Sequence, residues 1–377
     1  MIAGRQLFRE SISQSRIPTS VIAAIGLMLA LLFALTFLNL YGGVTGLLHV
    51  PSDRPETVAF LEDLVGPVST GPVHDGHYFF LLALDPLLLN ASDYVELLDV
   101  PDYRAQRILY PMLAGGFGLL GPRQTLWGLV VVNVLALAAG TWATSKLTVL
   151  MGGSPILGLA FVFNPGLFFE LAINGSSVVG FGFAVAALVS TSRSRWTLAA
   201  TLFAASVLAR ETMFLVAVGT FLYAWNCKHQ RRWRLILVPG VIALTWAGWV
   251  RISLGGISDT KSSLFDEPFS GLLLAVPSWL EQGGSTLFLG LLTVCCAIVT
   301  FVVAIRRPNS LAWAAAPFAP LLLFLNPFVL EEGANVTRSV APLITAGIVL
   351  AFSPRRTALD CAKRPANDEG AARSEQG

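Results

Sequence analysis

Residues able to do acid–base chemistry gather in the stretch HDGHYFFLLALDP. The group comprises His74, Asp75, His77, Tyr78 and Asp85. A carboxylate such as Asp75 can act as a general base when its neighbours tune it, and Gly76 would permit a sharp backbone turn directly after it. The alternative for Asp75 is an acid that merely solvates an aqueous loop. For Asp85, just before a proline, a turn or helix-capping role competes with a catalytic one.

Arginines that could hold an anion follow in the segment DVPDYRAQRILYPMLA. This segment contributes Tyr103, Arg104, Arg107 and Tyr110. Arg104 and Arg107 are three positions apart, so on a helix they would share one face. Arginine binds phosphate through two parallel hydrogen bonds. We therefore expect these two side chains to contact a phosphate or pyrophosphate head group.

Two further arginines lie against apolar runs. Arg210, beside Glu211, interrupts SVLARETMFLVAV, and Arg338 lies in ANVTRSVAPL. An ionisable residue at membrane depth is a functional candidate by default. The alternative is an Arg210–Glu211 or Arg338–Glu332 ion pair that only orders helices.

A metal site is a further alternative. His74 and His77, with Asp75 between them, could ligate a divalent ion such as Mg²⁺ or Mn²⁺, but no third histidine is close in the sequence. We assign no metal ligands and keep a divalent cation only as an alternative cofactor. The sequence has no Walker loop, GxGxxG, GxSxG or zinc-protease motif. ATP-driven transport and serine hydrolysis therefore lose support, and we expect no nucleic-acid partner.

The elements that must position these residues are long and apolar. The chain has 377 residues, of which 54% are hydrophobic and 13% charged, and its mean hydropathy is +0.68. Soluble domains carry about 25% charged residues. Continuous apolar runs predict an all-α, polytopic transmembrane bundle with about ten spanning helices. We place these helices near 17–40, 124–147, 155–171, 176–192, 196–209, 213–226, 235–254, 285–305, 311–330 and 339–353.

The distribution of charge predicts the orientation of this bundle. With both termini in the cytoplasm, the cytoplasmic side holds 17 of the 25 Lys and Arg residues and five of the 23 acids. We therefore predict a multi-pass protein of the inner (plasma) membrane. Residues 1–353 form one transmembrane domain, and 354–377 form a disordered cytoplasmic tail.

The longest exterior segment, 41–123, carries the first group of candidate residues. Its two apolar stretches, Tyr78–Leu89 and Ile108–Leu120, are too short to cross a membrane, and we expect them to lie at the interface or to dip partway into the membrane. Asn164-Pro165 and Asn326-Pro327 should close or kink helices.

With these residues in place, the chain resembles the GT-C superfamily of polytopic glycosyltransferases. The resemblance in layout covers residues 17–353: a first helix, a long exterior loop with an acidic residue, then many helices. Its specific part is HDGHYFFLLALDP followed by YRAQRILYPMLA, within 74–114. The adjacent or once-separated pair of acids usual in the superfamily is absent here, because Asp75 is flanked by His74 and Gly76.

The resemblance implies an inverting transferase that uses a polyprenyl-phosphate sugar donor and a glycan or lipid acceptor at the exterior face of the cell envelope. Asp75 would be the catalytic base. The donor phosphate would be bound by Arg104, Arg107, Arg210 and Arg338. Two alternatives remain: a secondary transporter or lipid flippase, and a non-catalytic membrane assembly factor.

Overall fold

The computed structural model describes residues 17–71, 74–255, 265–306 and 309–353. Over these residues the chain is mostly helical, with turns and loops between the helices, a short parallel pairing of β1 (Val50–Pro51) with β2 (Thr70–Gly71) and one isolated bridge. The predicted all-α class is confirmed for this part of the chain. The tail predicted at 354–377 lies outside the described residues.

Four helices are long and apolar enough to cross a membrane. They are α2 (Thr19–Leu40), α7 (Pro122–Leu150), the run Gln230–Ser253 that contains η7 (Gln230–Trp233) and α13 (Arg234–Ser253), and α15 (Gly284–Arg306). Two bent pairs of helices raise the number to six if each pair is one span. The first joins Pro155–Val162 to α9 (Pro165–Ala172) at 45°, and the second joins α19 (Gly333–Ser339) to α20 (Ala341–Phe352) at 78°.

The other predicted crossings are shorter than a full span. Helix α10 (Ser177–Ser192) has 16 residues, and a membrane needs about 20. The remaining helices of this group are α11 (Trp196–Ala209), η6 (Glu211–Met213), α12 (Phe214–Asn226), α16 (Ser310–Ala315), α17 (Phe318–Phe324) and α18 (Pro327–Leu330). Helix length therefore establishes four to six candidate spans among the described residues, and ten crossings stay a prediction.

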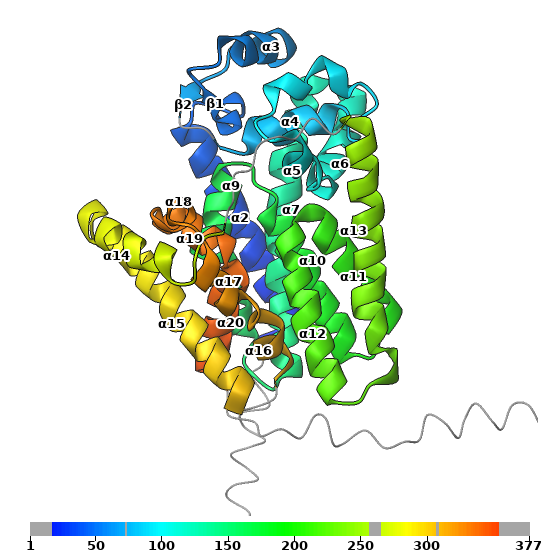
Figure 1. Ribbon diagram of the computed structural model, residues 1–377, viewed down its shortest axis with the longest axis vertical. Coiled ribbons are helices and arrows are strands. Elements are labelled where there is room, and N and C mark those ends of the chain that lie inside the picture. Colours follow the sequence, from blue (N-terminus) through cyan, green and yellow to red (C-terminus); the bar gives the residue numbers. More distant parts are fainter. Residues whose placement is uncertain (1–16, 72–73, 256–264, 307–308, 354–377) are drawn as a thin grey trace, which may run out of the picture.

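Short elements between α2 and α7 form a cap over one end of the bundle (Figure 1). They are η1 (Thr45–Leu48), α3 (Pro55–Val65), α4 (Gly76–Leu84), η2 (Ala91–Asp93), η3 (Val95–Leu97), α5 (Pro101–Ala105), α6 (Leu109–Gly115) and η4 (Gly116–Leu120). The helices α14 (Ser270–Gln282) and α15 lean away from the rest of the bundle (Figure 1). The other short elements are η5 (Pro155–Gly158) and α8 (Leu159–Val162).

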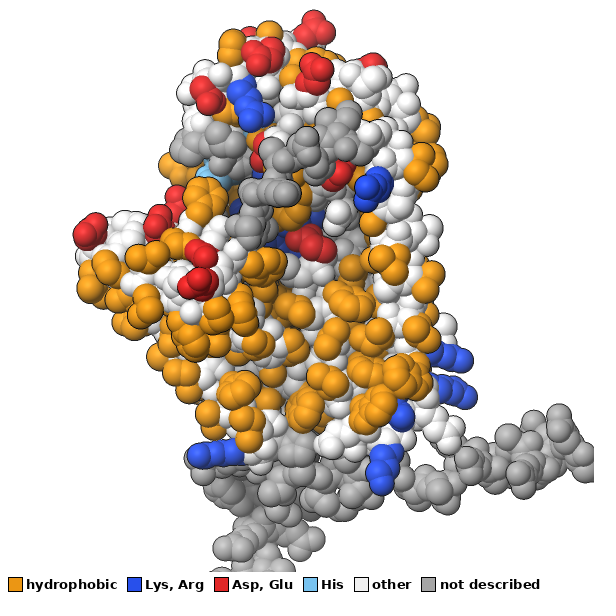
Figure 2. Space-filling model, viewed as in Figure 1, with side chains coloured by type: hydrophobic (Ala, Val, Ile, Leu, Met, Phe, Trp, Pro, Cys, Tyr) orange, Lys and Arg blue, Asp and Glu red, His pale blue; other side chains and the backbone are white. Residues whose placement is uncertain are grey.

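The surface is divided along the long axis (Figure 2). Acids gather on the cap and at the outer end of α14 and α15, lysines and arginines gather at the opposite end, and an apolar belt lies between them on this face. Basic and acidic side chains thus lie at opposite ends of the bundle, and which end faces the cytoplasm stays a prediction.

The first predicted interfacial stretch, Tyr78–Leu89, is buried over its helical part, whereas Leu87 and Leu89 are exposed. All of α4 except Leu84 is buried, so α4 packs inside the protein and does not lie on a membrane surface. Gly76 has no positive φ, which corrects its predicted role in a turn. A Cβ at Gly76 would lie 2.3 Å from the backbone oxygen of Leu47, so glycine is needed there for close packing. The second stretch keeps an apolar exposed end, with Leu119 94% exposed.

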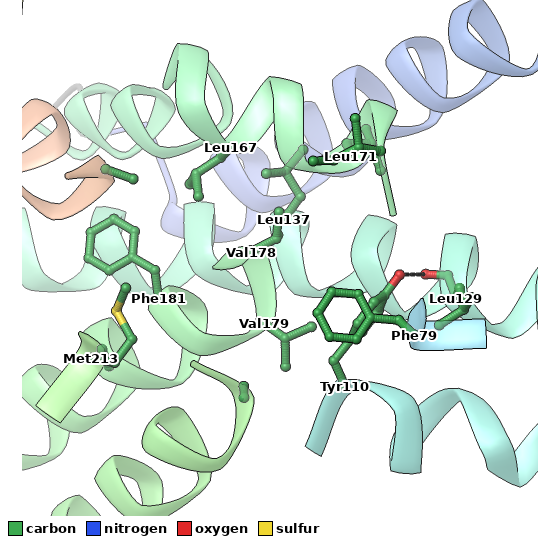
Figure 3. Close-up of a cluster of buried hydrophobic side chains, with 14 of the residues drawn as sticks. Phe79, Tyr110, Leu129, Leu137, Leu167, Leu171, Val178, Val179, Phe181 and Met213 are labelled. Atoms are coloured by element: carbon green, nitrogen blue, oxygen red, sulfur yellow. Dashed lines mark hydrogen bonds between the residues drawn. The ribbon is translucent and has the colours of Figure 1, made fainter. Parts of the chain in front are cut away.

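The core joins the cap to the bundle (Figure 3). Phe79 of α4 meets Tyr110 of α6 edge to face, with ring centroids 5.5 Å apart. The Tyr110 hydroxyl donates to the backbone oxygen of Leu129 in α7 at 3.0 Å, and Asn133 donates to the same hydroxyl at 2.9 Å. The candidate residue Tyr110 is therefore part of the packing that fixes the cap on α7.

The two bent pairs contact each other beside their breaks. Asn164 caps α9 by accepting from the Gly166 amide at 2.9 Å, and its Nδ2 donates to the Ala341 oxygen at 2.9 Å. A Cβ at Gly166 would lie 2.3 Å from the Thr337 oxygen, so α9 and α19 pack backbone against backbone. This contact places two charged side chains, Glu170 of α9 and Arg338 of α19, near each other in a mostly apolar environment.

Candidate functional site

A cavity of ≈ 370 Å³ lies between the cap and the ends of several bundle helices. Its polar lining consists of His74, Asp75, Asp99, Tyr103, Arg104, Arg107, Arg210, Glu211, Thr212, Glu332, Asn335, Arg338 and Ser339. Candidate site residues from distant parts of the sequence thus line one cavity. The carboxylate predicted as a base and all four arginines predicted to bind phosphate line the same cavity.

Asp75 is held between two arginines. Its Oδ1 accepts from Arg104 Nη1 at 2.5 Å, and its Oδ2 accepts from Arg338 Nη2 at 2.9 Å. Burial raises the pKa of Asp75, but Arg338 and Arg104 outweigh it, and the pKa lies well below its usual range. Asp75 is therefore an ionised, oriented carboxylate with 5% of its surface exposed.

Arg104 is fixed from a second direction. Its Nε and Nη2 donate to the two oxygens of Asp99 at 2.9 and 2.7 Å, which is a bidentate pair. Its guanidinium lies 4.4 Å from the centre of the Tyr78 ring, a cation–π contact. Burial and the nearby Asp99 raise the pKa of Tyr78 to about 12, so this phenol stays neutral. Tyr78 and Asp99 thus orient the arginine that orients Asp75.

Glu170, which was not predicted as a site residue, contacts Arg210 and Arg338. Glu170 is fully buried, and its Oε1 lies 3.3 Å from Arg210 Nη1 and 3.4 Å from Arg338 Nε. Its Oε2 accepts from the Ser177 amide at 2.8 Å. The available signal was a single acid inside the apolar run FNPGLFFELAIN, since charges within membrane-embedded helices are costly and rare. The span predicted near 155–171 includes Glu170, but no role was predicted for this residue.

The predicted alternative pairs of Arg210 and Arg338 are not formed among the described residues. Arg210 pairs with Glu170, and the neighbouring Glu211 instead accepts from Nε and Nη2 of Arg107, at 2.8 and 2.7 Å. Arg338 pairs with Asp75 and Glu170 rather than with Glu332.

Arg107 lies beyond the end of α5 but still reaches the cavity. It is 1% exposed, and it also donates to the Tyr103 hydroxyl. Burial raises the pKa of Glu211, but Arg107 outweighs burial and brings the pKa down to about 2. The Arg107–Glu211 pair is therefore charged on both sides at neutral pH.

The two predicted histidines differ in position. His74 lines the cavity, and its ring meets those of His49 and Phe169 edge to face at 5.1 and 5.4 Å. Burial and the positive neighbours lower the pKa of His74 to about 4. His77 is fully buried behind the cavity, where its Nδ1 lies 3.3 Å from the Leu48 oxygen, and burial lowers its pKa to about 4.

These histidines do not fit a metal centre as arranged. Within the described residues, no group of three His, Cys, Asp or Glu side chains is placed to hold an ion. Both oxygens of Asp75 are bound by arginines, which repel a cation.

Asp85 lies away from the cavity. Its oxygens accept from the amides of Leu89 and Asn90 at 3.0 and 2.7 Å, and the Tyr94 hydroxyl adds a contact at 3.3 Å. Asp85 therefore ends α4 and stabilises the turn that follows. This is the turn role that the sequence offered as the alternative to a catalytic one.

The remaining wall of the cavity is apolar. It consists of Phe265, Leu321, Leu325, Phe328 and Val329. Phe328 and Phe265 are 76% and 54% exposed, so this wall continues onto the outer apolar surface. A ligand that matches both walls has an anionic head and an apolar tail.

Comparisons with known proteins return no match: no family model, no curated protein and no solved structure is similar to this chain.

Proposed function

We propose that this protein is a membrane glycosyltransferase that takes a sugar from a polyprenyl-phosphate donor. The observation that carries the proposal is the cavity, in which a buried, oriented Asp75 lies among four arginines beside an apolar wall. Arginines suit the phosphate, and the apolar wall suits the first isoprenoid units of the lipid.

In the proposed reaction the acceptor hydroxyl attacks the anomeric carbon of the sugar. Asp75 takes the hydroxyl proton, the bond from the anomeric carbon to the phosphate oxygen breaks, and the lipid phosphate leaves with the electron pair. The configuration at the anomeric carbon inverts. Arginine guanidinium groups stabilise the charge that develops on the phosphate oxygen. Asp75 is ionised when no ligand is bound, as a base must be, but its low pKa makes it a weaker base than a carboxylate tuned toward neutral pH.

The acceptor in this proposal is a glycan or lipid at the exterior face. The cavity is lined by residues of the cap and of the loops on the same side as the cap. With the orientation predicted from the positive-inside rule, this side faces the periplasm or cell exterior.

A second candidate function, a transporter or flippase, is favoured by one observation. Arg338 lies beside the break of one bent helix pair and contacts Glu170, which is on α9 of the other pair, and broken helices with ionisable residues also form transport sites. This reading requires movement of a substrate across the membrane without cleavage of a bond.

The test uses the purified full-length chain in liposomes with a radiolabelled polyprenyl-phosphate sugar and a lipid and glycan extract as acceptor. We expect label to appear in a new, phosphate-free linkage. Label that crosses the bilayer while still attached to its lipid phosphate would favour the transporter. Intact donor that stays on one side would refute both functions.

A further inference from the structure

The end of the bundle opposite the cap carries a cluster of basic side chains. Two turns are in contact there: 193–195 joins α10 to α11, and 227–233, which contains η7, joins α12 to α13. The Arg234 guanidinium donates to the Thr197 hydroxyl at 2.9 Å, and the Trp196 ring lies 4.9 Å from that of His229. We call the six basic residues of this region the basic cluster: Arg193, Arg195, Lys228, Arg231, Arg232 and Arg234.

No acid of the described chain offsets the charge of the basic cluster. Between Glu170 and Asp259 the sequence has one acid, Glu211. That acid pairs with Arg107 in the cavity, at the opposite end of α12. Within the described residues none of the six basic side chains forms an ion pair, and all of them except Arg232 are exposed. Several accessible, uncompensated cations on one surface attract an anionic partner.

Aromatic rings hold one arginine of the cluster in place. The guanidinium of Arg232 lies 4.6 Å from the centre of the Trp225 ring and 5.9 Å from that of Trp233. Its Nη1 donates to the His229 oxygen at 2.8 Å. The rings of Trp225 and Trp233 meet edge to face at 5.2 Å, and both tryptophans are about half exposed, at 49% and 47%. A cation fixed on half-exposed tryptophans is typical of the boundary between lipid head groups and hydrocarbon.

The basic cluster borders the apolar belt of the surface. Leu222 near the end of α12 and Leu237 in the first turn of α13 are 43% and 58% exposed. Figure 2 shows basic side chains at this end of the molecule, next to the apolar belt. A partner that matches both surfaces carries a negative head group on hydrocarbon chains, as an anionic phospholipid does. A nucleic acid or an acidic protein would match the charge but leave the tryptophans and leucines uncovered.

We propose that the basic cluster binds the head group of an anionic phospholipid, with Lys228, Arg231 and Arg232 at the phosphate and Trp225 and Trp233 against the upper part of the acyl chains. The proposal does not depend on the proposed function, because the cluster lies outside the cavity. With the orientation predicted from the charge distribution, the lipid belongs to the cytoplasmic leaflet, whose surface is negative.

A head group bound at the cluster has a structural consequence. It bridges two turns that belong to different helix pairs, and the folded chain alone brings these turns together. A ligand that binds only the folded state raises the unfolding temperature. The helices α11 and α12 also lead from these turns to Arg210 and Glu211 in the wall of the cavity, so the lipid stabilises the helices that carry this wall.

The test follows thermal unfolding of the purified full-length chain in a neutral detergent, titrated with dioleoyl phosphatidylglycerol or with the zwitterionic dioleoyl phosphatidylcholine. We expect phosphatidylglycerol to raise the unfolding midpoint and phosphatidylcholine to leave it unchanged at the same mole fraction. Arg231→Gln and Arg232→Gln should each raise the half-saturating concentration of phosphatidylglycerol about fivefold, the usual effect of one basic residue at an anionic lipid surface. Arg231 is exposed and makes no ion pair with the described residues, so its variant should fold normally even if Arg232→Gln does not.

The matched control is Arg306→Gln, at an exposed arginine that ends α15 away from both turns. It should respond to phosphatidylglycerol like the wild type. An equal loss in Arg306→Gln and Arg231→Gln would show a response to the overall charge of this end and refute the site. Equal shifts with the two lipids, or a wild-type response in Arg231→Gln, would refute it as well. A shift of the same size with glycerol 3-phosphate would identify a site for free anions, and a shift with a short DNA duplex but not with phosphatidylglycerol would identify a nucleic-acid surface; either result overturns the lipid site.

Discussion

Asp75→Asn tests the chemistry at the centre of the cavity. The substitution keeps the size of the side chain but removes its ability to take a proton. A general base contributes about 10²–10⁴-fold to rate, or about 2.7–5.4 kcal/mol of transition-state stabilisation. We expect sugar transfer by Asp75→Asn to fall by at least about 10²-fold.

The structural cost of the same substitution is smaller and can be separated from the chemical one. Asp75 accepts from Arg104 at 2.5 Å and Arg338 at 2.9 Å. The amide that replaces the carboxylate keeps one acceptor oxygen, so one charge-assisted hydrogen bond is lost, worth about 1.5–3 kcal/mol. Asp99 and Glu170 still hold the two arginines. The variant should therefore fold and insert, with a lower unfolding temperature than the wild type.

The assay compares transfer from a radiolabelled polyprenyl-phosphate sugar with thermal unfolding of the same preparation. Asp85→Asn is the control, because Asp85 accepts from the Leu89 and Asn90 amides outside the cavity. It should lose about 1 kcal/mol of stability and little activity. A nearly normal rate for Asp75→Asn, or an equal loss of rate for Asp85→Asn, would show that Asp75 is not the base.

Three further predictions concern stability and topology. Glu211→Ala leaves the buried guanidinium of Arg107 without its half-buried carboxylate partner and should cost up to about 3–5 kcal/mol, measured by thermal unfolding in detergent. An unchanged midpoint would contradict a stabilising Arg107–Glu211 pair. The folded pKa of His74, about 4, lies below its unfolded value of 6.5, so the unfolded state binds the proton first and stability should fall as pH drops from about 6.5 to 4. His74→Gln should make that part of the curve less steep but not flat, because His77, whose pKa is also about 4, keeps its share; an equally steep curve would show that His74 does not contribute. Single cysteines at Ser69 and Gln230 should respectively react with and resist an impermeant thiol reagent in intact cells, and the reverse pattern would invert the topology.

The chemistry-bearing residues of the cavity were largely recognisable from the sequence, but their pairing was not. Arg210 is next to Glu211, yet it pairs with Glu170, 40 positions earlier. Consecutive residues point in different directions, so adjacency predicts a poor ion pair. Asp75 and Arg338 are 263 positions apart, and they meet because two tertiary contacts coincide: Gly76 packs on the backbone of Leu47, and α19 packs on α9.

The helix breaks were predicted in part. Asn164-Pro165 does interrupt an apolar run, with a bend of 45°, because proline begins α9 and Asn164 caps it. The bend of 78° between α19 and α20 was missed, although Pro342 in the first turn of α20 is a signal for a new helix start. Burial of α4 could not be predicted, since an apolar stretch of nine residues suits a membrane surface and a protein core equally well.

The side chains that form the ion pairs around Asp75 and Glu170 are far apart in the sequence, so they are synthesised at different times. The chain is made from its N-terminus, so α9 is synthesised well before α19. Until Arg338 arrives, Asp75 has Arg104 alone and Glu170 has Arg210 alone. A charge in a low-dielectric environment is costly when its partners are incomplete. The bundle therefore reaches electrostatic balance only when its final helices are inserted, and a chain truncated before α19 should be a poorly stable intermediate open to proteolysis.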